Sequence, residues 1–204
     1  MKRAAAFGIA GPIGFLVLSF VMAGLRPELI RALGWASWPS SMALGGLPGV
    51  PQTVAFLWLG LCYVVFSLGA LRPGLGSAIA WVGMLAVAMG DLLLASTTDA
   101  PGLGPTWHGT AHLFGVLLAT VATLVVAGGV TLVTRDRAAW RPWRYVAPVP
   151  FVAAFVGLVG GFDLGWAKVV YVIGVTLPAV AIGWLLRRDA DAGVARSLSG
   201  ARSG

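Results

Sequence analysis

The residues of this chain that are best suited to chemistry lie in one short stretch of sequence. Asp91 and Asp99 come first, and His108 and His112 follow. Residues four positions apart share a helix face, so the two histidines are expected to point in the same direction. Carboxylate and imidazole groups can exchange protons, bind polar ligands or hold a metal ion. The order of these four residues therefore predicts one cluster with such a role.

Three roles fit this cluster. A carboxylate that orients a histidine can tie two helices together, which contributes about 1 kcal/mol. The same pair can handle protons or bind a ligand. The third role is a zinc site. Its ligands would be His108, His112 and either Asp99 or Asp91. The chain lacks the glutamate of the His-Glu-x-x-His pattern of zinc hydrolases. We therefore expect no bound metal and keep this ligand set as an alternative.

The composition places these residues in a membrane protein. Of 204 residues, 58% are hydrophobic and 10% are charged, and the mean hydropathy is +0.90, whereas soluble domains are roughly 25% charged. We predict one all-α transmembrane domain of six spans at residues 1–188, followed by a disordered tail rich in Gly, Ser, Ala and Arg at residues 189–204. The predicted spans are residues 4–25, 52–71, 75–95, 107–134, 145–162 and 169–186.

The orientation follows from the cations, because Lys and Arg favour the cytoplasmic side of short loops. With the N-terminus inside, three cations lie outside, namely Arg26, Arg31 and Lys168. The eleven on the inner side are Lys2, Arg3, Arg72, Arg135, Arg137, Arg141, Arg144, Arg187, Arg188, Arg196 and Arg202. Both termini are therefore predicted to be cytoplasmic. Residues 26–51 then form a long outer loop whose tryptophans suit the membrane surface.

The predicted spans place Asp91 and His112 at matching depth. Asp91 lies near the outer end of the third span, and His112 lies near the outer start of the fourth. With about 1.5 Å of rise per residue, both lie ~6–8 Å below the membrane surface. An ionisable group at that depth costs about 2–3 kcal/mol unless it is paired or hydrated. We therefore predict that Asp91 and His112 pair inside the bundle.

A second outer segment carries Asp163 and Lys168. One interpretation is interfacial charge, with the lysine extending toward the headgroups. The other is that this segment closes a polar pocket centred on His112.

Several classes of protein are excluded by composition. The single cysteine, Cys62, lies in an apolar run, so a disulfide framework or a thiolate metal site is not expected. The net charge of +7 comes from cations scattered beside the spans, which argues for topology and against nucleic-acid binding. There is no phosphate-binding loop, and two histidines on one helix do not suit a bis-histidine haem. We expect no cofactor.

Three short motifs carry a family resemblance. Ser40-Ser41-Met42-Ala43-Leu44-Gly45 ends the first outer segment, Ser96-Thr97-Thr98-Asp99-Ala100-Pro101 follows the third span, and Gly109-Thr110-Ala111-His112 opens the fourth. In this pattern the chain resembles the bacterial membrane family named domain of unknown function 998, loosely related to Frag1-like proteins. The family more often has Phe-Pro before the aspartate and Pro directly after it. The resemblance implies a six-span fold in a bacterial plasma membrane and supplies no chemistry.

We expect a protein that binds a lipid or small amphiphile in an outer pocket, because its intramembrane ionisable groups gather on one side. The expected lining residues are Asp91, Asp99, His108, His112 and Asp163. A zinc-dependent membrane hydrolase of lipid esters or amides is the alternative, and a cyclase that uses an aspartic acid and tryptophan faces is more remote. Membrane lipids are the expected partners, and the sequence leaves the oligomeric state open.

Overall fold

The computed structural model describes residues 1–99, 104–160 and 164–200, with side chains described up to residue 192. Every regular element in these ranges is helical, which confirms the all-α prediction for that part of the chain. The longer helices are α1 (Lys2–Leu25), α3 (Val50–Phe66), α5 (Ala78–Leu94), α6 (Trp107–Thr134), α8 (Val149–Val159) and α9 (Gly165–Gly200). The shorter elements are α2 (Pro27–Leu33), η1 (Trp35–Ser37), η2 (Ser40–Ala43), η3 (Leu47–Gly49), η4 (Ser67–Leu71), α4 (Arg72–Leu75), η5 (Ala138–Trp140) and α7 (Trp143–Val146).

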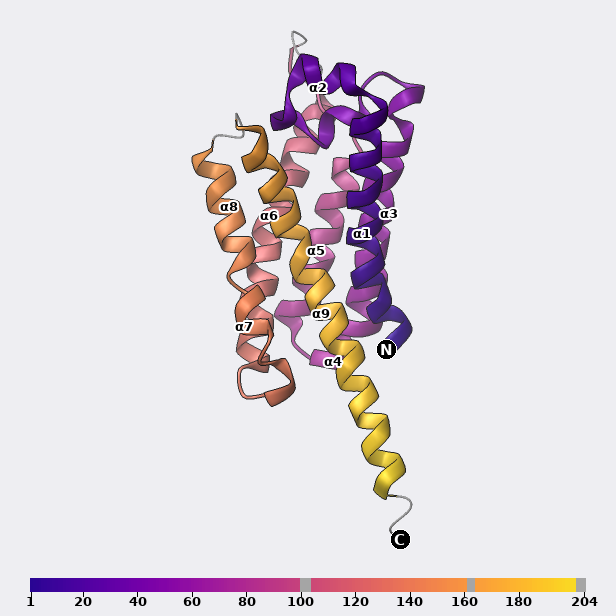
Figure 1. The fold of residues 1–204 in the computed structure, drawn as a ribbon, viewed down its shortest axis with the longest axis vertical. Coiled ribbons are helices and arrows are strands. Elements are labelled where there is room, and N and C mark those ends of the chain that lie inside the picture. Colours follow the sequence, from indigo (N-terminus) through magenta and orange to yellow (C-terminus); the bar gives the residue numbers. More distant parts are fainter. Residues whose placement is uncertain (100–103, 161–163, 201–204) are drawn as a thin grey trace.

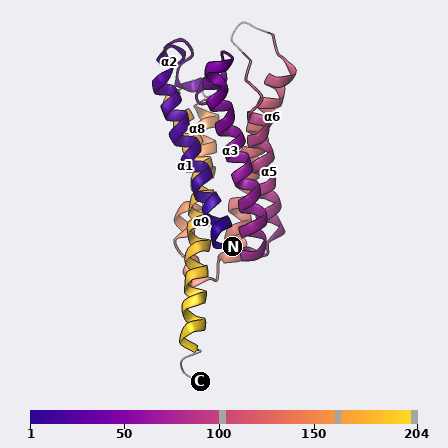
Figure 2. The same cartoon turned by 90° about the vertical axis from the view of Figure 1, so that its right-hand side faces the viewer.

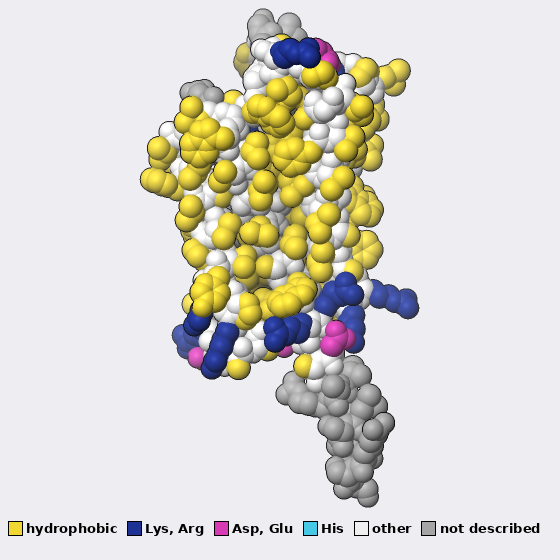
Figure 3. Space-filling view, in the orientation of Figure 1, with side chains coloured by type: hydrophobic (Ala, Val, Ile, Leu, Met, Phe, Trp, Pro, Cys, Tyr) yellow, Lys and Arg dark blue, Asp and Glu magenta, His cyan; other side chains and the backbone are white. Residues whose placement is uncertain are grey.

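The helices have the length and surface of a multi-pass membrane protein. Five stretches in the described residues are long and apolar enough to cross a membrane: Lys2–Leu25, Leu47–Leu75, Trp107–Thr134, Ala138–Val159 and Gly165–Ala192. The remaining predicted span corresponds to α5, a shorter apolar helix of 17 residues. Apolar side chains cover the face of the bundle that Figure 3 shows. On α6, Leu117, Val121 and Leu132 are each more than half exposed. Such a surface suits lipid rather than water.

The bundle brings the chain ends together. Helix α1 packs against α3 and α9, α5 packs against α3 and α6, and α8 packs against α9. The N-terminus and the C-terminal end of α9 lie at the same end of the bundle, and α9 extends past it (Figures 1 and 2). The transmembrane domain is predicted to end at residue 188, and α9 continues to Gly200. Its extension begins with two contacts, because Asp189 accepts a 2.7 Å hydrogen bond from Trp140 Nε1 and Asp191 pairs with Lys2.

The segment of residues 26–51 differs from its prediction as a surface loop. It folds into α2, η1, η2 and η3, and Trp38 is fully buried. The indole Nε1 of Trp38 donates a 3.1 Å hydrogen bond to the Ser19 carbonyl, and Gln52 Nε2 donates a 2.9 Å bond to the Ser19 hydroxyl. The first of these bonds satisfies the buried indole N–H, and the second links α3 to α1 beside it. They fix η2 over the end of the bundle.

Helices α5 and α6 approach each other at two glycines. A Cβ placed on Gly115 would lie 2.7 Å from the Gly90 carbonyl oxygen, and one on Gly90 would lie 2.8 Å from the Gly115 carbonyl oxygen. Only residues without a side chain permit this backbone contact. The contact brings Ser96, just beyond α5, next to the N-terminal turns of α6.

Candidate functional site

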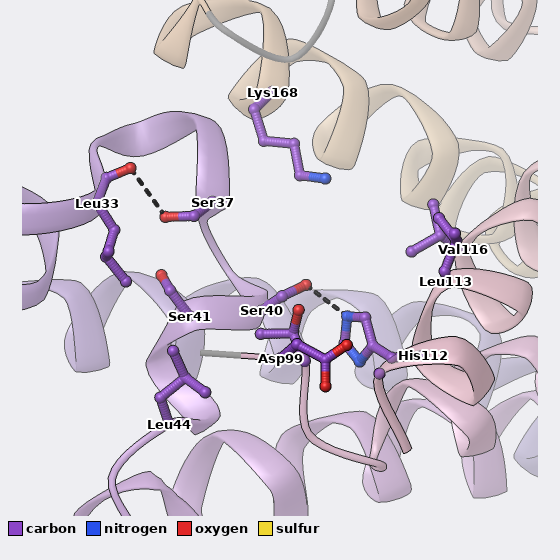
Figure 4. A pocket seen from close by; sticks show the side chains of 12 residues that line it. Leu33, Ser37, Ser40, Ser41, Leu44, Asp99, His112, Leu113, Val116 and Lys168 are labelled. Carbon is purple, nitrogen blue, oxygen red and sulfur yellow. Dashed lines mark hydrogen bonds between the residues drawn. The ribbon is translucent and has the colours of Figure 1, made fainter. Parts of the chain in front are cut away.

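A pocket of about 370 Å³ opens where η2, the segment after α5, α6 and α9 meet (Figure 4). Hydroxyl, carboxylate, imidazole and amine groups lie around it, together with four apolar side chains. Its lining residues are Leu33, Ser37, Ser40, Ser41, Leu44, Thr98, Asp99, Gly109, His112, Leu113, Val116 and Lys168. Two of the predicted site residues, Asp99 and His112, therefore share one pocket.

His112 is held by a hydrogen bond at each ring nitrogen. Nδ1 lies 2.7 Å from the Ser96 carbonyl oxygen, and Nε2 lies 2.8 Å from the Ser40 hydroxyl. A carbonyl oxygen only accepts, so Nδ1 carries the proton, and in the neutral ring Nε2 accepts from Ser40. The ring meets Phe56 edge-on, with centroids 6.0 Å apart and planes at 88°. His112 is 4% exposed, and these contacts together fix the orientation of its ring.

Asp99 and His108 belong to a cap at the start of α6. The Thr106 hydroxyl accepts a 3.1 Å hydrogen bond from the Gly109 amide and donates one to the Asp99 carboxylate. The Thr106 amide also donates to that carboxylate at 3.2 Å. His108 Nδ1 lies 3.1 Å from the Thr97 carbonyl oxygen and 3.9 Å from the carboxylate. Asp99 thus ties the preceding segment to the helix, while His108 stands beside the pocket without lining it.

This cap gives the stability a pH dependence. The hydrogen bond from the Thr106 hydroxyl holds the pKa of the Asp99 carboxyl below its ordinary 3.8, against a smaller opposing effect of burial. A lowered pKa means that the carboxylate stabilises the fold above pH 3.8 and that this contribution is lost as the pH falls through the folded value. Thermal unfolding in detergent between about pH 6 and pH 3 should show this loss, and Asp99→Asn should reduce the slope. An unchanged slope in that variant would contradict the role of the cap.

The predicted pairing of Asp91 with His112 is wrong. Both ring nitrogens of His112 bind other groups, and Asp91 Oδ2 has no hydrogen-bond partner among the described residues. The register and rotation of the two helices explain why: His112 lies beside Ser96, whereas Gly90, next to Asp91, packs against Gly115 and Ala119 further along α6. Gly90 faces α6, and the next residue is turned by about 100° around the helix. Asp91 therefore lies against a separate inner cavity of about 60 Å³, beside Tyr171, and is 5% exposed.

The zinc alternative also lacks its ligand set. Within residues 1–99, 104–160 and 164–200, no three His, Cys, Asp or Glu side chains are grouped so that they could hold a metal ion. His108 and His112 share a helix face, but each ring is turned to a different carbonyl group, those of Thr97 and Ser96. Main-chain carbonyls beyond α5 orient the two rings apart, which the spacing alone does not indicate.

Lys168 and Ser40 are two polar residues of the pocket that are absent from the predicted set. Lys168 lies in the first turn of α9, is half-buried and lines both the pocket and the inner cavity. Figure 4 shows its amine directed into the space beside Ser40 and His112. Ser40 belongs to a motif that carries the family resemblance, although no role follows from that motif. Asp163 lies outside the described residues.

No family model, curated protein or solved structure matches the chain.

Proposed function

We propose that the protein binds a lipid or small amphiphile in the pocket between η2 and α6. The observation that carries this proposal is the make-up of the lining. Ser40, His112 and Lys168 offer polar contacts, and Leu113, which also lines the pocket, is 60% exposed on the bundle surface. A polar interior that opens onto an apolar surface suits a molecule with a polar head and an apolar chain.

The size of the pocket limits what enters. Its volume of about 370 Å³ falls near the lower end of small-molecule sites, which span roughly 300–1,000 Å³. A headgroup with the first part of a chain fits this space, and the rest of the chain then lies along the exposed face of α6. Leu113 and Leu117, one turn apart and more than half exposed, form that face.

The proposal includes six spans, with both termini in the cytoplasm of a bacterium. It also includes membership of the family named domain of unknown function 998. Helix α5 supports the sixth span, since 17 residues reach about 25 Å of the ~30 Å core. Lys and Arg side chains gather at the end of the bundle that carries the N-terminus (Figure 3), as the positive-inside rule expects for a cytoplasmic face. The pocket then faces the outer leaflet.

Cysteine labelling tests this orientation. In a Cys62→Ala background, Ala139→Cys is expected to react with an impermeant maleimide only after the cells are opened, while Thr98→Cys reacts in intact cells. The physical reason is the excess of cations around residue 139, which favours retention on the cytoplasmic side. Reaction of Ala139→Cys in intact cells would place the pocket on the opposite side of the membrane.

Photocrosslinking tests the ligand. The purified protein is placed in vesicles that contain a clickable phospholipid with a diazirine near its ester group, and adducts are mapped by mass spectrometry. We expect adducts on the residues that line the pocket. Leu113→Trp places a large ring at the mouth, so we expect about a tenfold loss of these adducts. Leu132→Trp is the matched control, because Leu132 is 63% exposed near the other end of the same helix and does not line the pocket.

Equal losses from the two tryptophan variants would show that the adducts report only the outer surface of α6. Adducts spread evenly over the exposed helix faces would likewise contradict a specific site.

A further inference from the structure

Ser40, His112 and Ser96 form a chain of hydrogen bonds with the order found in nucleophilic catalysis. The Ser40 hydroxyl lies 2.8 Å from His112 Nε2, and the opposite nitrogen lies 2.7 Å from the Ser96 carbonyl oxygen. A hydroxyl activated by an imidazole, whose other nitrogen is oriented by a third group, is the arrangement by which enzymes turn serine into a nucleophile. In this chain the Ser96 carbonyl orients the imidazole, a role that a carboxylate more often has.

Ser40 is more exposed than His112, as expected for a nucleophile and its general base. Ser40 is half-buried and borders both the outer pocket and the inner cavity, so its oxygen can meet a bound molecule. His112 is 4% exposed and is covered by Phe56. The base is thereby shielded from bulk water while the hydroxyl remains accessible.

Other hydrogen bonds also hold η2 in place. Arg26 Nη1 binds the carbonyl oxygens of Met42 at 3.0 Å and Leu44 at 2.6 Å. Trp38 anchors the preceding residues to α1 through Ser19. The Ser40–His112 contact is therefore not the sole attachment of this segment to the bundle.

A cation that can stabilise a developing negative charge lies in the same pocket. The amine of Lys168 enters the space beside Ser40 (Figure 4). Hydrogen-bond donors and a cation placed near a reacting carbonyl stabilise its oxyanion.

We propose that Ser40 and His112 act as a nucleophile and general base that hydrolyse an ester bond of an acyl amphiphile. This inference rests on the proposed function, since the same pocket must first hold the amphiphile. Ser40 Oγ bonds to the acyl carbon as its proton passes to His112 Nε2, and the carbonyl electron pair moves onto the oxygen. The carbon–oxygen bond to the leaving alcohol then breaks, and that oxygen takes the proton from Nε2.

The acyl group on Ser40 is released by water. A water molecule gives a proton to Nε2 as its oxygen bonds to the acyl carbon, and the bond to Ser40 breaks as the serine regains that proton. The products are a carboxylic acid and an alcohol. An ester is favoured over an amide, because the neutral Ser96 carbonyl stabilises the imidazolium less than a carboxylate does and the leaving group must therefore depart more easily.

A long-chain alkyl fluorophosphonate tests the inference, since it forms a stable bond with an activated serine. The full chain in lipid nanodiscs is treated with the probe, and the modified peptide is identified by mass spectrometry. We expect modification at Ser40, none in Ser40→Ala, and a rate about 10²–10⁴-fold lower in His112→Gln. Ser77→Ala is the control, because Ser77 caps the first turn of α5 and does not line the pocket, so its loss should leave the labelling unchanged.

Wild-type labelling needs no variant to fold, so the first result stands alone. Modification elsewhere, or a rate that is unaffected by His112→Gln, would overturn the inference. Absence of labelling while the phospholipid still crosslinks in the pocket would also overturn it and leave ligand binding intact. Absence of both labelling and crosslinking would overturn both proposals.

Discussion

Gly115→Leu is expected to prevent α5 and α6 from packing, with the largest loss of stability of any change considered for this protein. The added Cβ would lie 2.7 Å from the Gly90 carbonyl oxygen and 3.0 Å from the Leu93 Cβ. The first of these atoms belongs to the backbone, so relief requires that the helices separate. Overpacking of this kind costs about 1–3 kcal/mol or more. Separation also withdraws the Ser96 carbonyl from His112, so the pocket is lost with the fold.

Gly128→Leu is the matched control on the same helix, because a Cβ at Gly128 meets nothing within 4 Å. The two variants are compared by the yield of monodisperse protein and by thermal unfolding in detergent. We expect Gly115→Leu to aggregate or to melt well below the wild type, and Gly128→Leu to melt close to it. Equal behaviour would contradict the close approach of α5 and α6.

Asp91→Leu is expected to make the protein more stable. Asp91 is 5% exposed, and its Oδ2 has no hydrogen-bond partner among the described residues. A buried polar atom without a partner costs about 1–3 kcal/mol. Removing it should raise the melting temperature by about 2–12 °C, because the adjoining cavity of about 60 Å³ receives part of the leucine.

Asp99→Leu is the opposite case and the control for this measurement. Its carboxylate accepts hydrogen bonds from the Thr106 hydroxyl and amide, so the same change should lower the melting temperature. A fall in both variants would show that Asp91 has a stabilising partner in lipid, such as a bound ligand or water. The two aspartates therefore give opposite signs from the same substitution.

The sequence predicts the helices better than it predicts what they face. The apolar run at residues 107–134 coincides with α6, because lipid selects length and apolarity whatever the neighbours are. The pairing of Asp91 with His112 could not be predicted correctly, since the register and rotation of α5 against α6 depend on the contact at Gly90, and many glycines in the chain could have made such a contact.

The polar partners of His112 could not be predicted for a related reason. Ser40 lies 72 residues away in the sequence, and serine is common in segments between spans. Its position depends on Trp38, which the sequence analysis places at the membrane surface and the structure buries. A fully buried tryptophan pulls η2 onto the bundle, and only then do the hydroxyl and the imidazole meet.

A high-resolution structure of the protein in lipid nanodiscs would show whether the pocket holds an amphiphile. We expect density for a molecule whose polar end lies within hydrogen-bonding distance of Ser40, His112 or Lys168 and whose chain passes Leu113 onto the face of α6. A pocket filled by the protein's own side chains, or one that holds water while lipid density stays on the outer helix faces, would contradict it.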